Sequence, residues 1–115
     1  MASSRASSRR KFGNRKSGGY DSKREMLRAG TLSLMQRTGE ISELREQVRF
    51  ELIPKQVDSD GRCIERACTY TADFVYRDRD GELVVEDVKG FPNDRWPIKR
   101  KLMLWVHGIR VQEVK

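Results

Sequence analysis

Residues 69–89 read TYTADFVYRDRDGELVVEDVK. Two runs rich in Tyr, Thr, Phe and Val stand on either side of Asp80-Gly81, the strongest turn signal in the chain. Runs of this composition separated by a short glycine-containing turn are typical of a β-hairpin. We therefore expect residues 69–77 and 82–89 to pair as antiparallel strands.

The register of this hairpin brings together three side chains that could take part in catalysis, two carboxylates and a lysine. A three-residue loop that ends in a left-handed glycine pairs Asp78 with Glu82. The same register places Asp73 opposite Asp87. Lys89 lies two residues beyond Asp87 and shares its face, because strand side chains alternate.

Two carboxylates and a lysine suggest metal-dependent phosphodiester chemistry. Opposed carboxylates cost stability in a sheet unless a positive charge lies between them. Mg²⁺ is typically held by one or two carboxylates plus substrate phosphate, which Asp73 and Asp87 can supply. The ion would activate a water, while Lys89 would either orient that water or offset charge in the transition state. The competing interpretation is a solvated charged face, and a slip of one residue would put Glu86 in the place of Asp87.

A first helix is expected over residues 23–37. Ser22 followed by Glu25 has the spelling of a capping box, and Gly39 would end the helix. Glu25 either closes the helix start or borders the inward stripe and reaches a metal. Apolar residues at helical spacing predict that stripe: Leu27, Thr31, Leu34, Leu32 and Met35.

The remaining elements complete an α/β order. Residues 48–53 alternate as a strand does, and residues 57–66 are a loop or a ragged hairpin. Asp94 is expected to cap a second helix that Gly108 closes, before a last strand over residues 109–114. Four residues predict its buried face: Ile98, Leu102, Trp105 and Val106. The resulting order is α-β-β-β-α-β, a mixed sheet flanked by helices.

The net charge of +7, from 24 basic and 17 acidic residues, is unevenly spread. Residues 1–19 contain six basic residues and no acid, so we expect a disordered basic arm before a single domain over residues 20–115. Such an arm indicates a polyanionic partner, most often nucleic acid, although a solubility tail would have the same composition. The expected phosphate contacts are Arg9, Arg10, Lys11, Arg15 and Lys16 of the arm with Lys99 and Arg100 of the second helix.

Other classes of protein are disfavoured by composition. No apolar run approaches the roughly 18 residues that a membrane span needs, and no apolar segment opens the chain, so we expect a soluble intracellular protein. A structural zinc site needs four ligands at characteristic spacing. Cys63, Cys68 and His107 are the only cysteine and histidine residues, and we expect reduced thiols.

Four segments together resemble a family of small phage and prophage proteins within the PD-(D/E)XK nuclease superfamily. The likeness covers the chain from about Tyr20 onwards, in the segments YDSKRE (20–25), QVRFEL (47–52), YTADF (70–74) and VEDVKG (85–90). The resemblance implies a restriction-endonuclease-like core that cuts DNA with Mg²⁺ or Mn²⁺. It makes Asp73 the first motif acid, Asp87 and Lys89 the acid and lysine of the triplet, and Glu25 the helix glutamate. Ala72 stands where the motif's name has proline.

Small phage relatives of this layout are similar to endonuclease I-type Holliday junction resolvases. That likeness implies a homodimer acting on branched DNA during phage recombination or replication, in the cytoplasm of the bacterial host. Two alternatives stay open. One is a non-catalytic nucleic-acid-binding protein with a nuclease-like fold, and the other is a repair or restriction-type nickase.

Overall fold

The computed structural model describes residues 22–88 and 94–115. Two helices and six strands lie in this part of the chain. In chain order they are α1 (Lys23–Arg37), β2 (Ser42–Ile53), β3 (Gln56–Val57), β4 (Cys63–Glu65), β5 (Cys68–Arg77), β6 (Leu83–Val88), α2 (Trp96–His107) and β7 (Gln112–Val114). The predicted bounds of the first helix are confirmed, and the predicted excursion over residues 57–66 is a short β3–β4 hairpin.

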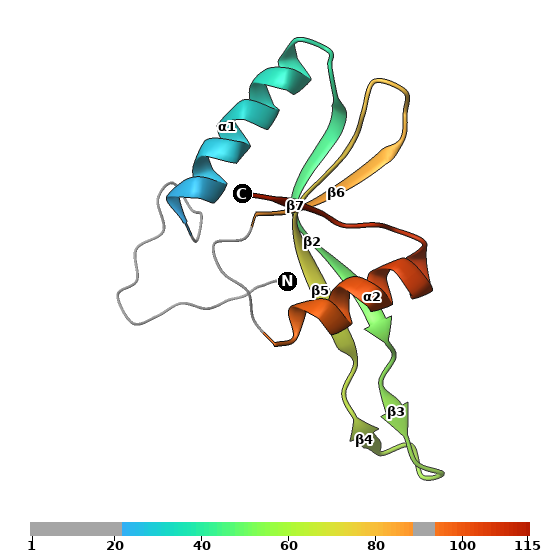
Figure 1. The fold of residues 1–115 in the computed structure, drawn as a ribbon. Coiled ribbons are helices and arrows are strands. Elements are labelled where there is room, and N and C mark those ends of the chain that lie inside the picture. The colour runs from blue at the N-terminus through green and yellow to red at the C-terminus, as the bar shows by residue number, and fades with distance from the viewer. Residues whose placement is uncertain (1–21, 89–93) are drawn as a thin grey trace.

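The main sheet has four strands in the order β2-β5-β6-β7. β2, β5 and β6 pair antiparallel, whereas β7 runs parallel to β6 after the crossover through α2. Figure 1 shows α1 beside the upper half of this sheet and α2 beside its lower half. The mixed sheet with helices confirms the α/β class.

The register predicted for the β5–β6 hairpin is confirmed as far as Phe74 and Glu86, one pair short of Asp73 and Asp87. Phe74 pairs with Glu86, and the Asp78 N–H donates to Glu82 O at 2.9 Å. Gly81 closes the loop with φ +82°, a left-handed conformation that glycine adopts without a steric penalty. Turn chemistry therefore fixed the relative position of the two strands that carry the acidic residues.

Two hydrophobic cores lie on opposite faces of the sheet. Val84 belongs to one core and Val85 to the other, as expected from the alternation of side chains along a strand. The α1-side core comprises Ala29, Leu32, Ile41, Phe74, Tyr76, Val84 and Val88. The α2-side core comprises Leu52, Tyr70, Ala72, Val75, Val85, Trp96, Met103 and Val111.

The predicted buried stripe of α1 is wrong in part. Leu27 and Leu34 are 62% and 53% exposed, whereas Ala29 and Leu32 are buried. Glu25 lies on the same buried face, one and two turns before these residues. The stripe predicted from the leucine positions was misplaced because a polar side chain, that of Glu25, occupies one of the inward positions.

The buried face of α2 was also misassigned. Ile98 and Trp105 are 61% and 83% exposed, and Val106 is 45% exposed. Trp96 and Met103 are buried instead, seven residues apart on one face. Leu102 was predicted correctly as a partly buried neighbour of that core.

The N-cap predicted for α2 is wrong, whereas its predicted C-cap is confirmed. The N-cap is Arg95 and makes no side-chain hydrogen bond, so the Asp94 cap was wrong. Pro97 in the first turn lacks the N–H that a cap would satisfy, which lessens the need for one. Gly108 closes the helix in the left-handed conformation, as predicted.

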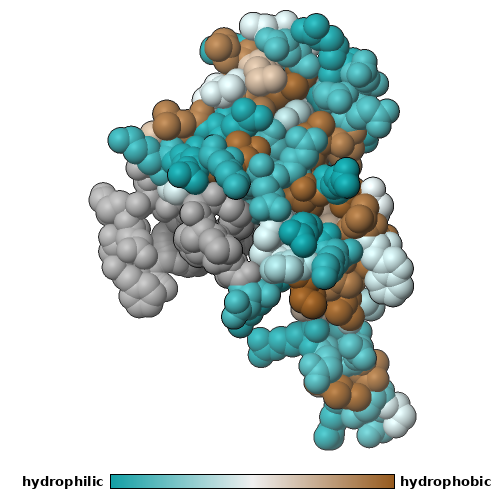
Figure 2. Space-filling model, in the orientation of Figure 1, coloured by the Kyte–Doolittle hydropathy of each residue, from teal (hydrophilic) through white to brown (hydrophobic). Residues whose placement is uncertain are grey.

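The β3–β4 hairpin projects from the end of β2 and β5 (Figure 1). Val57 and Ile64 are 48% and 60% exposed there, and hydrophobic patches stand out on this projection in Figure 2. Cys63, in β4, and Cys68, at the start of β5, are both free thiols. Over the described ranges, 22–88 and 94–115, no helix combines the length and apolar character needed to cross a bilayer.

Candidate active site

Asp73 marks the point where β5 and β6 part. The backbone ladder between the two strands ends at Phe74 and Glu86. Beyond this pair, Oδ2 of Asp73 accepts the Val88 N–H at 2.7 Å, so a side-chain hydrogen bond links the two strands there. Ala72 belongs to the α2-side core and Phe74 to the α1-side core, so the alternation of β5 changes phase at Asp73. Simple alternation therefore does not describe where this carboxylate lies.

Asp87 lies deep in the α2 side of the sheet. Its exposed fraction is 1%, and its Oδ1 accepts the hydroxyl of Tyr70 at 2.8 Å. Burial raises the pKa of Tyr70, and the negative charges of Asp87 and then Asp73 raise it further. Asp87 therefore binds the buried Tyr70 hydroxyl directly, and the charge of Asp73 adds to the same upward pKa shift.

Glu25 is buried at the start of α1 with an exposed fraction of 5%. Its backbone N–H donates to Ser22 Oγ at 3.0 Å, so the predicted N-cap is present. Its carboxylate is turned to the sheet, where Oε2 accepts from Gln47 Nε2 at 2.8 Å. The cap bond is therefore made by the backbone of Glu25, while its carboxylate meets Gln47.

Gln47 is the site residue that the sequence interpretation missed. Its Nε2 also donates to Asp73 Oδ1 at 3.3 Å, so one amide bridges the carboxylates of Glu25 and Asp73. Gln47 opens the QVRFEL segment, where only its position before an alternating strand could have drawn attention to it. A glutamine there reads as an ordinary polar strand residue.

Glu86 is engaged elsewhere and does not replace Asp87. It lies on the α1 side, 1% exposed, and Arg28 of α1 binds both of its oxygens at 2.9 and 2.7 Å. The Tyr76 hydroxyl also donates to this carboxylate. The hydrogen bond to Glu86 raises the pKa of Arg28, and burial raises that of Tyr76 to about 12. The register slip considered above does not occur.

Two of the three candidate carboxylates, those of Glu25 and Asp73, share one hydrogen-bond donor. Among the described residues, no group of three or more His, Cys, Asp and Glu side chains is close enough to hold a metal ion. The hydrogen bonds nevertheless bring Glu25 and Asp73 to one amide, and Asp87 and Asp73 both influence Tyr70. The donor set consists of carboxylate oxygens, which fit Mg²⁺ or Mn²⁺.

Several predicted residues fall outside the part of the chain that the structure describes. They are Lys89 and the arm residues Arg9, Arg10, Lys11, Arg15 and Lys16. Lys99 and Arg100 lie half-buried on α2, where Arg100 Nη1 is 3.9 Å from Glu113 Oε2.

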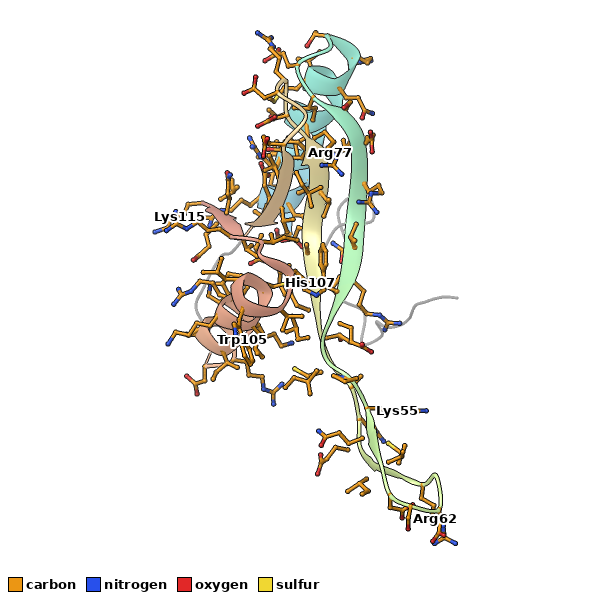
Figure 3. All side chains as sticks on the ribbon, turned by 90° about the vertical axis from the view of Figure 1, so that its right-hand side faces the viewer. Lys55, Arg62, Arg77, Trp105, His107 and Lys115 are labelled. Atoms are coloured by element: carbon orange, nitrogen blue, oxygen red, sulfur yellow. The ribbon has the colours of Figure 1, made fainter. Side chains whose placement is uncertain are left out.

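Two aromatic rings of α2, those of Trp96 and His107, pack against the sheet, whereas Trp105 is exposed. His107 Nε2 is 2.7 Å from Glu51 O, and its ring meets Phe50 edge-on at 5.5 Å. Figure 3 shows His107 beside the sheet and Trp105 on the outer side of α2. Trp96 is buried against Tyr70, with ring centroids 5.5 Å apart. Trp96 therefore supports the hydroxyl that binds Asp87.

Comparison with known proteins gives one match. A family model described as "Protein of unknown function (DUF1064)" matches residues 9–113. The chain belongs to the DUF1064 family. The matched range includes the candidate acids Glu25, Asp73 and Asp87, together with Gln47 and Lys89. No curated protein and no solved structure matches this DUF1064 chain.

Proposed function

We propose that this DUF1064 protein is a metal-dependent endodeoxyribonuclease of the PD-(D/E)XK type that acts on branched DNA. The observation that carries the proposal is the bridge from Glu25 through Gln47 to Asp73, with Asp87 buried on the adjoining strand. Three elements, α1, β5 and β6, contribute one carboxylate each. The resemblance in the sequence assigns the same three acids to a nuclease centre.

Electrostatics supports a cation at this site. Glu25 and Asp87 are almost fully buried, and charged carboxylates are rarely buried without a positive or hydrogen-bonding partner. The donors that orient them include neutral groups, namely the Gln47 amide, the Tyr70 hydroxyl and the Val88 N–H. A divalent cation would offset the mutual repulsion of the acids.

Each side chain has a role in the proposed centre. Asp73 and Asp87 would hold Mg²⁺ or Mn²⁺, with Glu25 as a further ligand, directly or through a water. The bound ion would supply Lewis-acid chemistry at the scissile phosphate and a more acidic water. Tyr70 keeps Asp87 in position by its hydrogen bond. Lys89 would orient the attacking water or stabilise negative charge on phosphorus.

The charge distribution supports DNA as the substrate. Six basic residues and no acid within residues 1–19 favour contacts with the phosphate backbone, which carry no sequence information. Symmetric cutting of two strands requires two active sites, so we propose a homodimer. A junction-directed role in phage recombination, in the host cytoplasm, fits both features.

Cleavage of a labelled four-way junction and a matched linear duplex tests this proposal. Wild type is compared with Lys89→Ala, in Mg²⁺ and in chelator. We expect junction cutting that needs Mg²⁺ and is lost in Lys89→Ala while binding persists. Equal binding by both proteins with no cutting of either substrate would instead indicate a non-catalytic DNA-binding protein. Preferential cutting of the duplex would indicate a nickase or restriction-type activity.

A further inference from the structure

Gln47 has an unusual backbone conformation. Its φ is +53°, although it lies inside β2 and is not glycine. Residues other than glycine rarely adopt positive φ, and such outliers persist only where the surrounding structure imposes them. The conformation therefore requires an explanation in the packing around Gln47.

Glu43 offers a comparison within the same strand. It has nearly the same φ, +55°, but lies where the β2–β5 register shifts between Ser42 and Arg45. An extra residue in a β-bulge accounts for that conformation. No shift occurs around Gln47, because Glu46 pairs with Phe74 and Val48 with Ala72. A bulge does not explain the left-handed backbone at Gln47.

Both strands change faces at the level of Gln47 and Asp73. Along β2, Leu44 packs against the α1-side core and Val48 against the α2-side core, although both numbers are even. Along β5, Ala72 and Phe74 show the same change across Asp73. Gln47 and Asp73 therefore stand opposite each other at the point where the regular alternation of both strands is interrupted.

At this interruption, the side chain of Gln47 donates hydrogen bonds to two carboxylates. A carboxamide has two N–H hydrogens, and Nε2 donates to Glu25 Oε2 at 2.8 Å and to Asp73 Oδ1 at 3.3 Å. These acids come from different elements, α1 and β5. A neutral double donor between two carboxylates holds them together without adding a charge that would compete with a cation.

We propose that Gln47 is a positioning residue that holds Glu25 and Asp73 together until a divalent cation binds, and that its left-handed backbone aims the amide between them. The cation part of this inference rests on the proposed nuclease function. The positioning of Asp73 does not, because it follows from the hydrogen bonds of its carboxylate to Gln47 and Val88.

Three variants separate the amide from the backbone. Gln47→Gly removes the amide and relieves the left-handed strain, so it is expected to fold. Gln47→Glu keeps the reach of the side chain but replaces the donor with a third carboxylate. Glu43→Gly is the matched control, since it relieves the same backbone conformation in the same strand and leaves the bridge intact.

Amide hydrogen exchange of Val88, measured by NMR in chelator, reports on Asp73 without metal. Asp73 Oδ2 accepts this N–H, so loss of the Gln47 bridge should loosen it. We expect exchange to accelerate by about fivefold or more in Gln47→Gly and to stay unchanged in Glu43→Gly. Unchanged exchange in Gln47→Gly, or an equal rise in Glu43→Gly, would overturn the inference.

Mn²⁺ titration by calorimetry adds the metal-dependent signature. Gln47→Gly should bind Mn²⁺ about 10- to 100-fold more weakly than wild type, the usual effect of losing a residue that orients a ligand. Gln47→Glu should melt lowest in chelator and recover most in Mn²⁺, which a purely structural role would not produce. Wild-type affinity in Gln47→Gly would contradict the inference. If wild type itself neither binds Mn²⁺ nor cuts DNA, the nuclease proposal fails, while Val88 exchange still decides whether Gln47 positions Asp73.

Discussion

At the scale of single residues, the site depends on hydrogen bonds made by neutral side chains to buried or half-buried acids. Tyr70 donates to Asp87, and Gln47 donates to Glu25 and Asp73. The relative positions of Asp73 and Asp87 were predictable, because turn chemistry fixes the register of their hairpin. Gln47 was not, because a left-handed residue inside a strand leaves no periodic signal in the sequence.

Tyr70→Phe should destabilise the fold by about 1.5–3 kcal/mol, because a hydrogen bond to a buried carboxylate is removed with little change in volume. The same variant should slow cleavage, since Asp87 loses the group that orients it. Urea denaturation followed by circular dichroism measures the stability. A free energy of unfolding equal to that of wild type would show that the Tyr70 hydroxyl does not support Asp87.

Tyr76 should make stability fall in alkali. Burial, and next the hydrogen bond to Glu86, raise its pKa from 10.0 to about 12. Because the folded pKa lies above the unfolded one, the neutral hydroxyl contributes fully below about pH 10, and its contribution is lost as the pH rises to about 12. Urea unfolding at about pH 9 and about pH 11 should show a larger loss for wild type than for Tyr76→Phe. Equal losses would count against this assignment.

At the scale of elements, α1 is fastened to β6 by Arg28 and Glu86. This ion pair joins the helix that carries Glu25 to the strand that carries Asp87. The extent of α1 was predictable from its capping signal and glycine stop. The face of α1 that packs against the sheet was not predictable. Two leucines of the helix are exposed, whereas the inward face includes the buried Glu25 and the half-buried Arg28.

Arg28→Leu should cost about 3 kcal/mol, because it leaves the buried Glu86 carboxylate without its cation. Arg100→Leu is the matched control. Its partner Glu113 is exposed and 3.9 Å away, so its loss should cost less than about 1 kcal/mol. Thermal or urea unfolding of both variants measures the difference. Similar small losses would mean that the Arg28–Glu86 pair does not fasten α1 to the sheet.

At the scale of the whole molecule, the excess of positive charge is concentrated in residues 1–19. The six basic residues of residues 1–19 precede α1, whereas the described β3–β4 hairpin carries Lys55, Arg62 and Arg66 among acidic residues. Arg62 lies at the tip of that hairpin (Figure 3). Composition predicted where the charge gathers, and the sequence allowed a hairpin over residues 57–66, but neither indicated that this hairpin projects from the sheet with exposed apolar side chains.

Replacing Arg9, Arg10 and Lys11 together with Gln should weaken DNA binding and flatten its dependence on salt. For every phosphate that is no longer neutralised, the slope of log K against log salt should decrease by about 0.9 on duplex arms. The triple change of Lys55, Arg62 and Arg66 to Gln removes the same charge and should alter the slope less. Fluorescence anisotropy over a range of salt measures both. Equal slopes for the two variants would argue against the N-terminal residues as the site that binds DNA.

Single-turnover cleavage of a four-way junction by Asp73→Asn tests the central claim most directly. Asp80→Asn is the matched control, an identical change at the exposed turn of the same hairpin. With Mg²⁺ added to the preformed complex, Asp73→Asn should cut at least about 100-fold more slowly than wild type while binding the junction as well or better. Asp80→Asn should cut like wild type. Equal rates for Asp73→Asn and Asp80→Asn would contradict a carboxylate-centred nuclease site in this protein.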